Sequence, residues 1–219
     1  MICEKEKLIL KNDQILSIEK DEGCPVDVSK RLMEIAMKEA CGIDVFCREG
    51  TRQAYQIIKD ITEGRGRSGD DELLLELFTI ISEQAGCELT RAYASKSIEF
   101  LNNNQEEWDK HIKRNRCTTL TCKSSFTLYV EPKSCTGCGH CLDICPEKAI
   151  TGGKEMIHLI ASDICSKCMA CIGVCPVGAI NKAGIVKPRL PESPIPVGTF
   201  IVESSSEEGE SRRRRRRRG

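Results

Sequence analysis

The sequence of 219 residues contains few aromatic side chains, which make up only 4% of its residues. No apolar run approaches the roughly 20 residues that a membrane-spanning helix needs, so we expect no membrane span. The first residues, MICEKEKLILKND, lack the apolar core of a secretory signal peptide. These absences predict a cytoplasmic protein, long enough for one large or two small domains.

Cysteine, by contrast, is abundant, with 15 residues in the chain. An odd number of cysteines, together with the lack of a secretory signal, argues against a disulfide framework. In a reducing compartment, clustered cysteines bind metals more often than they pair with each other. We therefore interpret the cysteines as metal ligands and assign them by their spacing.

Charge is segregated along the chain, although the net charge is zero. Seven arginines, Arg212 to Arg218, form one run, and without them 26 basic residues face 33 acidic ones. Residues 188–219 are rich in Pro, Ser, Glu and Arg, and we predict a disordered tail there. Its arginines could contact nucleic acid, an anionic membrane or an acidic partner, but no aromatic residues are interleaved to stack on bases. A tail without a specific role is the favoured interpretation, and nucleic acid is not an expected partner.

Local patterns indicate short strands first and helices after them. Residues 1–24 contain the turn signal LILKNDQILSIEK and are predicted to form a short hairpin or the remnant of a larger sheet. Apolar residues at helical spacing then predict a helical bundle over residues 25–115. Ser68 is a candidate N-cap of its third helix, and two more helices are expected over 91–101 and 105–113. The apolar stripes are Val28, Leu32, Ile35 and Ala36, then Ala54, Ile57, Ile58 and Ile61, then Leu73, Leu74, Leu77, Phe78 and Ile81.

Two segments repeat the pattern C-x2-C-x2-C-x3-C-P with a following Ala-Ile: CTGCGHCLDICPEKAI from residue 135 and CSKCMACIGVCPVGAI from residue 165. A cubane of iron and sulfide requires soft thiolate ligands, and the two-residue gaps wrap the backbone around three of its corners. The cysteine before the proline binds the neighbouring cluster. The pattern therefore predicts two [4Fe-4S] clusters, with Cys135, Cys138, Cys141 and Cys175 as ligands of the first and Cys165, Cys168, Cys171 and Cys145 as ligands of the second.

Zinc knuckles or a disulfide knot are the alternatives for this segment. A zinc site would need only two C-x-x-C pairs. It would not require the third cysteine of each C-x2-C-x2-C run or the Cys-Pro that ends each repeat. Residues 127–187 resemble the bacterial two-cluster ferredoxins, which implies a ferredoxin-like fold with two pseudo-symmetric halves. His140, in the first loop, is expected at the surface or as a modifier of the cluster potential. His158 is expected to be structural or solvent-facing.

The helical segment contains the run CGIDVFCREGT from residue 41, and another cysteine follows at Cys87. With EEWDKHIKRNRC and the ferredoxin repeats behind it, this run resembles the C-terminal part of the NADH-binding flavoprotein subunit of respiratory complex I. The resemblance is closer to the equivalent subunit of NAD-reducing and electron-bifurcating hydrogenases. That family carries the motif C-G-x-C-x-x-C-R-E-G-T with one later cysteine, and these four cysteines bind an iron-sulfur cluster.

One ligand of that motif is exchanged in this sequence, because Asp44 stands where the family has its second cysteine. The resemblance implies a candidate third cluster, [4Fe-4S] or [3Fe-4S], at Cys41, Asp44, Cys47 and Cys87. A carboxylate is a harder ligand than a thiolate and is expected to weaken its corner and favour the loss of one iron. The alternative is a vestigial site whose helices still pack.

The second difference from the family is that its FMN- and NADH-binding region has no counterpart in this sequence. No Gly-rich strand-to-helix turn precedes the bundle, and only residues 1–24 stand before it. We therefore expect no FMN or NAD site in this sequence and no oxidation of NADH by it alone.

Four residues outside these motifs are candidates for a zinc site. Cys117 and Cys122 form C-x4-C, His111 precedes them, and Cys24 stands before the first helix. Three cysteines and one histidine suit a closed tetrahedral site that stabilises a joint, here the linker 116–126. Some hydrogenase-type relatives carry zinc here, so the resemblance implies the ligands Cys24, His111, Cys117 and Cys122. The alternative is four unrelated residues.

The fold class that follows is α+β, with an N-terminal helical bundle, a two-cluster ferredoxin-like domain and a disordered tail. The expected function is electron transfer between a flavin- or NAD(P)-linked partner and a hydrogenase, formate dehydrogenase or ferredoxin partner. No residue is assigned as an acid, base or nucleophile, and Cys3 is expected to have no role. The alternatives are a metal-stabilised scaffold or regulatory subunit without redox chemistry, and a remnant of a longer flavoprotein subunit.

Overall fold

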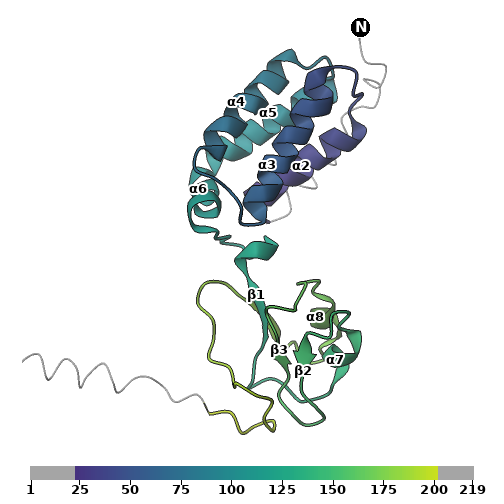
Figure 1. The fold of residues 1–219 in the computed structure, drawn as a ribbon, viewed down its shortest axis with the longest axis vertical. Coiled ribbons are helices and arrows are strands. Elements are labelled where there is room, and N and C mark those ends of the chain that lie inside the picture. The colour runs from purple at the N-terminus through teal and green to yellow at the C-terminus, as the bar shows by residue number, and fades with distance from the viewer. Residues whose placement is uncertain (1–22, 202–219) are drawn as a thin grey trace, which may run out of the picture. The chain divides into compact units, whose positions relative to one another are not determined.

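The computed structural model describes residues 23–201, which form two compact units (Figure 1). The first unit holds the helices up to residue 127, and the second covers residues 128–183 and 187–201. The predicted hairpin, Cys3 and the arginine run lie outside the described residues. Within the described part of the chain, no helix is both long and apolar enough to cross a membrane. The elements are those of an α+β protein, as the sequence predicts.

The first unit is a helical bundle, as expected. α2 packs on α3 and α5, and α4 packs on α5, while α6 contacts all four. The bundle interior is apolar, with the fully buried Trp108, Tyr93 and Phe78 as its largest side chains. The helices are α2 (Pro25–Glu39), α3 (Thr51–Thr62), α4 (Asp70–Gln84), α5 (Glu88–Asn103) and α6 (Gln105–Arg114).

The predicted apolar stripes form the core with one exception. Leu73 is 49% exposed, whereas its neighbour Leu74 is fully buried. Consecutive residues point about 100° apart around a helix, and this turn takes Leu73 out of the buried face of α4. Most stripe residues are buried or pack partly buried against the core: Val28, Leu32, Ile35, Ala36, Ala54, Ile57, Ile58, Ile61, Leu77, Phe78 and Ile81.

Two helix starts differ from the sequence predictions. Ser68 is not the N-cap of α4, since Gly69 occupies that position with a φ of 92°. The Asp70 carboxylate instead accepts a hydrogen bond from the backbone N–H of Arg67 at 2.7 Å. α5 begins before the predicted residue 91, with Cys87 as its N-cap.

The second unit contains short elements around two cysteine loops. Two small sheets pair β1 with β4 and β2 with β3, and the latter pair is antiparallel with Ile150 opposite Ile160. The predicted Ala-Ile strands are present, because β2 and β4 each begin at the isoleucine. The elements are β1 (Thr127–Val130), α7 (His140–Ile144), β2 (Ile150–Thr151), β3 (Leu159–Ile160), α8 (Ala170–Val174) and β4 (Ile180–Ala183).

Residues 188–201 were predicted as part of the tail, but the structure describes them as a segment that pairs with the ferredoxin-like unit. The Ile157 N–H donates to the Ile195 carbonyl at 2.8 Å, and the Val197 N–H donates to the Glu155 carbonyl at 2.9 Å. The predicted start of the tail at residue 188 was therefore too early. The prolines of PRLPESPIPVG contributed to the prediction of disorder, yet proline leaves the carbonyl groups and the other N–H groups free to pair.

Candidate metal centres

Eight cysteines of the second unit line two cavities, four in each. Each cavity receives three cysteines from one repeat and the cysteine before the proline from the other repeat. This reciprocal arrangement is the one that two neighbouring cubane clusters require. The first cavity is lined by Cys135, Cys138, Cys141 and Cys175, and the second by Cys165, Cys168, Cys171 and Cys145.

The two repeats build these cavities in the same way. α7 follows Gly139 and α8 follows Met169, and both of these residues have a left-handed backbone, with φ values of 86° and 64°. Each helix ends at the cysteine before the proline, and Cys145 and Cys175 share a ψ of 111°. This bend turns the fourth thiol away from its own loop and towards the other cavity.

Backbone N–H groups point at the sulfur atoms. Ala149 N–H donates to Cys145 Sγ at 3.3 Å, and Ala179 N–H donates to Cys175 Sγ at 3.2 Å. Such donors stabilise thiolates and the extra negative charge of a reduced cluster. Soft thiol ligands, N–H donors and apolar walls together fit a [4Fe-4S] cluster in each cavity.

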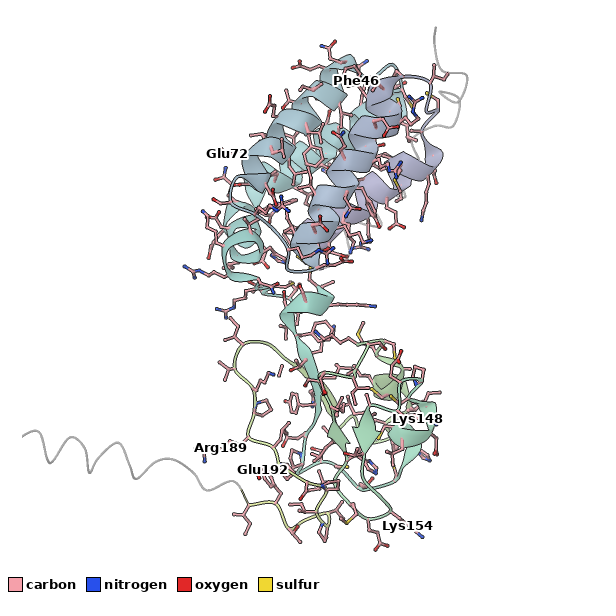
Figure 2. All side chains as sticks on the ribbon, in the orientation of Figure 1. Phe46, Glu72, Lys148, Lys154, Arg189 and Glu192 are labelled. Carbon is pink, nitrogen blue, oxygen red and sulfur yellow. The ribbon has the colours of Figure 1, made fainter. Side chains whose placement is uncertain are left out.

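A third group of thiols meets at one end of the helical bundle, the end marked by Phe46 in Figure 2. The Sγ atoms of Cys41, Cys47 and Cys87 lie within 4.8 Å of one another. Cys41 follows the end of α2, Cys47 lies in the π-helical turn η2 (Phe46–Gly50), and Cys87 is the N-cap of α5. Three separate elements thus deliver one thiol each.

The π-helical turn is a feature that the sequence did not predict. The Thr51 N–H bonds to the Phe46 carbonyl, and the Thr51 hydroxyl donates to the Cys47 carbonyl at 2.7 Å. Gly50 leaves little room for a side chain, because a Cβ atom there would lie 3.1 Å from Cγ1 of Ile81. Turns of this kind often occur at functional sites, and this one aims Cys47 at the other two thiols.

Asp44 lies beside Cys47, at the edge of this thiol group. Its Oδ1 accepts the Cys47 N–H at 2.7 Å, and its Oδ2 accepts the Gly86 N–H and the Cys47 thiol, both at 3.0 Å. Burial would raise the pKa of Asp44, but these hydrogen bonds lower it below its ordinary value. The group therefore offers three soft sulfurs and one ionised, harder oxygen beside Cys47.

Without a metal, the Cys47 thiol keeps its proton and donates it to the Asp44 carboxylate. Burial, and then the Asp44 carboxylate, raise the pKa of the Cys47 thiol well above its usual range. Burial would also raise the pKa of Cys87, but backbone N–H groups near Cys41 and Thr90 lower it. A bound cation or cluster would offset the charges of a Cys47 thiolate and the Asp44 carboxylate, so that Cys47 could give up its proton and bind as a thiolate.

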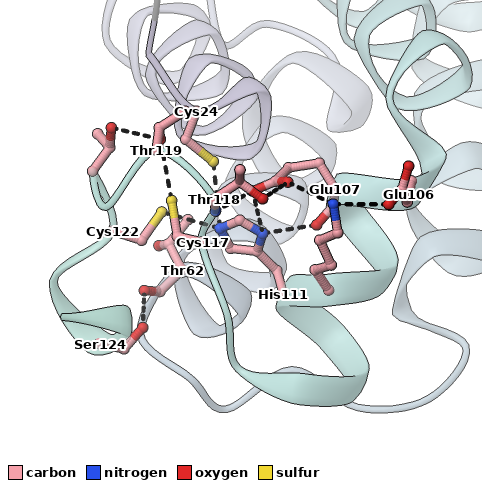
Figure 3. Close-up of polar contacts among 12 residues, drawn as sticks. Cys24, Thr62, Glu106, Glu107, His111, Cys117, Thr118, Thr119, Cys122 and Ser124 are labelled. Carbon is pink, nitrogen blue, oxygen red and sulfur yellow. Dashed lines mark hydrogen bonds and ion pairs between the residues drawn. The ribbon is translucent and has the colours of Figure 1, made fainter. Parts of the chain in front are cut away.

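The candidate zinc ligands also meet, and all four are buried (Figure 3). The Nε2 atom of His111 lies 3.3 Å from Cys24 Sγ and 3.4 Å from Cys122 Sγ. With the Sγ atom of Cys117, these four atoms lie within 4.8 Å of one another. Sulfurs that share one zinc ion at about 2.3 Å lie about 3.8 Å apart, so the spacing fits a single tetrahedral ion.

Surrounding groups hold these ligands in place (Figure 3). His111 Nδ1 lies 2.8 Å from the Glu107 carbonyl, which fixes the proton on Nδ1 and leaves Nε2 free to bind a metal. The Glu107 carboxylate accepts two hydrogen bonds from Thr118, from its N–H at 2.8 Å and from its hydroxyl at 2.6 Å. Glu107 therefore positions both the histidine and the loop that carries Cys117.

Electrostatics inside this group favour a thiolate at Cys117, whereas hydrogen bonds with Cys117 and Cys24 raise the pKa of the Cys122 thiol. Burial would lower the pKa of His111, but the thiols of Cys117 and Cys24 raise it to about 10. Hydrogen bonds from Cys122 and Cys24 lower the pKa of Cys117 far below its usual range. The raised pKa of His111 and the lowered pKa of Cys117 mean that the imidazole holds a proton beside a thiolate. A metal ion can replace this proton, because metal ligands bind in their deprotonated forms.

The two histidines of the second unit differ. His140 is exposed, in line with its expected surface position. His158, expected to be structural or solvent-facing, is only 1% exposed, and its Nδ1 lies 3.3 Å from Cys141 Sγ. The contact with a cluster-type cysteine was missed. The 30-residue repeat offered one signal for this contact. A shift of 30 residues aligns His158 with Leu128, so the two halves differ at this position and only the second half carries a polar ring there.

Two known families match this chain, one in each structural unit, and the boundary between the units lies between the two matches. Residues 27–111 match the NADH-ubiquinone oxidoreductase-F iron-sulfur binding region, and residues 134–179 match the 4Fe-4S dicluster domain. The resemblance drawn from CGIDVFCREGT and from the cysteine repeats is thereby confirmed.

Curated relatives combine these parts in longer chains. The NADP-reducing hydrogenase subunit HndC of Solidesulfovibrio fructosivorans is 31% identical over 138 residues, which are 63% of this chain and 28% of HndC. The F-type subunit of the NADH-quinone oxidoreductase of Streptomyces coelicolor is 31% identical over 102 residues, 47% of this chain and 23% of that protein. The NADP(+)-dependent formate dehydrogenase subunit beta of Moorella thermoacetica is 38% identical over 63 residues, 29% of this chain and 9% of that protein. The chain thus spans less than a third of each of these relatives.

Proposed function

Because this chain joins an iron-sulfur binding region of the NADH-ubiquinone oxidoreductase-F type to a 4Fe-4S dicluster domain, we propose that it is an electron-transfer module of an NAD(P)-linked oxidoreductase complex. The observation that carries this proposal is the reciprocal pair of four-thiol cavities in the second unit. A bound [4Fe-4S] cluster takes up and releases single electrons without a proton donor or a nucleophile in the protein.

The residues around the cavities have three tasks. The eight cysteines hold the clusters, the N–H groups of Ala149 and Ala179 stabilise negative charge on sulfur, and apolar side chains such as Val130 and Ile160 keep water away. Exchange of the fourth cysteine between the repeats ties the two cavities into one unit, and α7 packs on α8. Two adjacent sites suit stepwise transfer from one partner to another.

The relatives indicate the kind of partner. Their names describe an NADP-reducing hydrogenase, NADH-quinone oxidoreductases and an NADP(+)-dependent formate dehydrogenase. We propose partners of the same classes: a flavoprotein or other NAD(P)-linked subunit on one side, and a hydrogenase, a formate dehydrogenase or a ferredoxin on the other.

The helical unit would add two further sites to this module. Cys41, Cys47 and Cys87, with Asp44 at the fourth position, are proposed to hold a third cluster, [3Fe-4S] or [4Fe-4S]. The group of Cys24, His111, Cys117 and Cys122 is proposed to hold one zinc ion with a structural task. Both proposals are supported by short distances, among the three sulfurs of the first group and among the four ligand atoms of the second. Asp44 joins the first group through its 3.0 Å contact with the Cys47 thiol.

Metal and sulfide analysis of the full chain, purified without oxygen, tests the proposed function. Two clusters in the second unit require at least about eight irons and eight sulfides per chain, a brown colour, and bleaching by dithionite. Cys175→Ser should lower the iron content and alter the EPR spectrum of the reduced protein, while Cys3→Ser, at a cysteine outside all four groups, should change neither. A colourless protein that contains zinc but no sulfide would instead support the metal-stabilised scaffold.

A further inference from the structure

We infer that His158 donates a hydrogen bond to the Cys141 ligand and so gives the first dicluster site a higher reduction potential than the second. The inference rests on the proposed function, since it concerns two bound clusters. His158 lies directly before β3, outside both cysteine loops, so none of the metal-binding motifs contains it.

The imidazole is buried against the first cavity. Its Nδ1 atom lies 3.3 Å from Cys141 Sγ and 4.0 Å from Cys135 Sγ, and the side chain is 1% exposed. Nε2 is also buried and has no hydrogen-bond partner among residues 23–201. The polar contacts of the ring are thus directed at two thiols of one cluster site.

The direction of the hydrogen bond follows from the chemistry of the ligand. A thiolate bound to iron has no proton to donate, so the ring nitrogen that faces it has to be the donor. A neutral imidazole with its proton on Nδ1 meets this requirement. His158 therefore adds a side-chain donor to a sulfur that lies away from the backbone N–H groups of Ala149 and Ala179.

The fold leaves room for this ring at one glycine. Gly152 has a φ of 144°, and a Cβ atom there would lie 2.4 Å from Cδ2 of His158. Both the backbone conformation and the space exclude a larger residue. The histidine is therefore held against the thiols by its surroundings and has little freedom to turn away.

The second cavity lacks this donor. The two halves of the unit are related by a shift of 30 residues, so that Val130 corresponds to Ile160 and both line a cavity. The same shift relates His158, which lines the first cavity, to Leu128, which lines the second. An aliphatic side chain thus stands where the other half carries an imidazole.

A second unmatched pair acts in the same direction. Val177 lines the first cavity, and its counterpart Glu147 lines the second. The Glu147 side chain is exposed, so solvent screens its charge, but a carboxylate near a cluster disfavours the reduced state. The imidazole and the missing carboxylate both favour an added electron at the first site, and they act against Lys167, whose N–H donates to Cys165 Sγ at 3.4 Å in the second.

Hydrogen bonds to the ligand sulfurs are one of the factors that set the potential of an iron-sulfur cluster. Reduction adds one electron and one negative charge, which spreads onto the sulfurs and strengthens a bond from a donor such as Nδ1–H. At equilibrium, a single electron on the module should therefore reside at the first site, bound by Cys141, before the second site is reduced.

An EPR-monitored titration of the anaerobic full chain, with dithionite as reductant, tests this. We expect two midpoint potentials, and His158→Leu should lower one of them by about 59 mV. For a one-electron couple, this shift is a tenfold fall in the ratio of reduced to oxidised cluster at a fixed potential. His158→Asn keeps an N–H donor near the position of Nδ1 and should retain most of the native potential. His140→Leu, at the exposed histidine of the first cysteine loop, should leave both potentials unchanged.

Leu128→His places a donor at the matching point of the second cavity and should raise the other midpoint, so the test does not depend on one variant. Iron and sulfide contents are measured in the same samples. Their absence from the native chain would contradict the proposed function. Intact clusters whose midpoint potentials are the same in the native chain and in the variants would contradict this inference alone. If His158→Leu does not assemble its clusters, Leu128→His decides: a raised midpoint supports the inference, and two native midpoints overturn it.

Discussion

The Nε2 atom of His111 lies 3.3 Å from Sγ of Cys24, although 87 positions separate the two residues. Cys24 is the N-cap of α2, the first described helix, and His111 lies in the last turn of α6. A metal ion bound by both residues, together with Cys117 and Cys122, would cross-link the two ends of the helical unit. Structural zinc contributes its binding free energy to folding in this way.

Cys24→Ser should therefore remove about one zinc per chain and lower the midpoint of thermal unfolding by at least about 4 °C, since each kcal/mol is worth about that much in a small domain. Zinc content by elemental analysis and unfolding by circular dichroism provide the two measurements. Cys3→Ser is the matched control and should change neither value. Full zinc occupancy in Cys24→Ser would show that Cys24 is not a ligand.

The Glu107 side chain offers a test of the groups that surround the zinc ligands. Glu107→Ala removes both hydrogen bonds to Thr118, and we expect the zinc affinity to fall about 10- to 100-fold. Competition with a chromophoric chelator measures this change. Glu106→Ala is the control, because Glu106 is 87% exposed and pairs with Lys110 on the surface. Equal affinities in the two variants would limit the role of Glu107 to its backbone carbonyl.

Asp44 determines what the third site can hold. Asp44→Cys supplies a fourth thiolate and should bring the iron content close to about 12 per chain, the number for three four-iron clusters. Asp44→Asn keeps the size but removes the charge, and it should hold less iron at this site than the native chain. Iron analysis and EPR follow both changes. Identical iron contents and spectra in all three proteins would place Asp44 outside any cluster.

Gly152 and Gly153 form a matched pair of adjacent glycines. Gly152→Ala places a Cβ atom 2.4 Å from the His158 ring at a φ of 144°, and we expect a loss of about 1–3 kcal/mol of stability. Gly153→Ala meets only Cγ of Met156, at 3.8 Å, and should be close to neutral. Anaerobic thermal unfolding compares the two. A Gly152→Ala protein as stable as Gly153→Ala would mean that the His158 ring can move aside at little cost.

The sequence by itself determined the local features of this protein. The C-x2-C-x2-C spacing defines three corners of a cluster loop within seven residues, and helical periodicity marks the bundle core, because both are properties of neighbouring residues. The sequence predictions were wrong where the position of a residue depended on parts of the chain beyond its neighbours. Leu73 and Ser68 satisfied the pattern, but the packing direction of α4 and the left-handed backbone of Gly69 decided otherwise.

Only the tertiary structure decided which distant groups meet. The contacts of His158 with Cys141 and of Asp44 with Gly86 depend on how strands and helices pack, over separations of 17 and 42 residues. No periodicity encodes such distances, since they result from the summed burial of apolar surface across the whole unit. The candidate ligands could thus be named from the sequence, while the surroundings that would set their properties came from the fold.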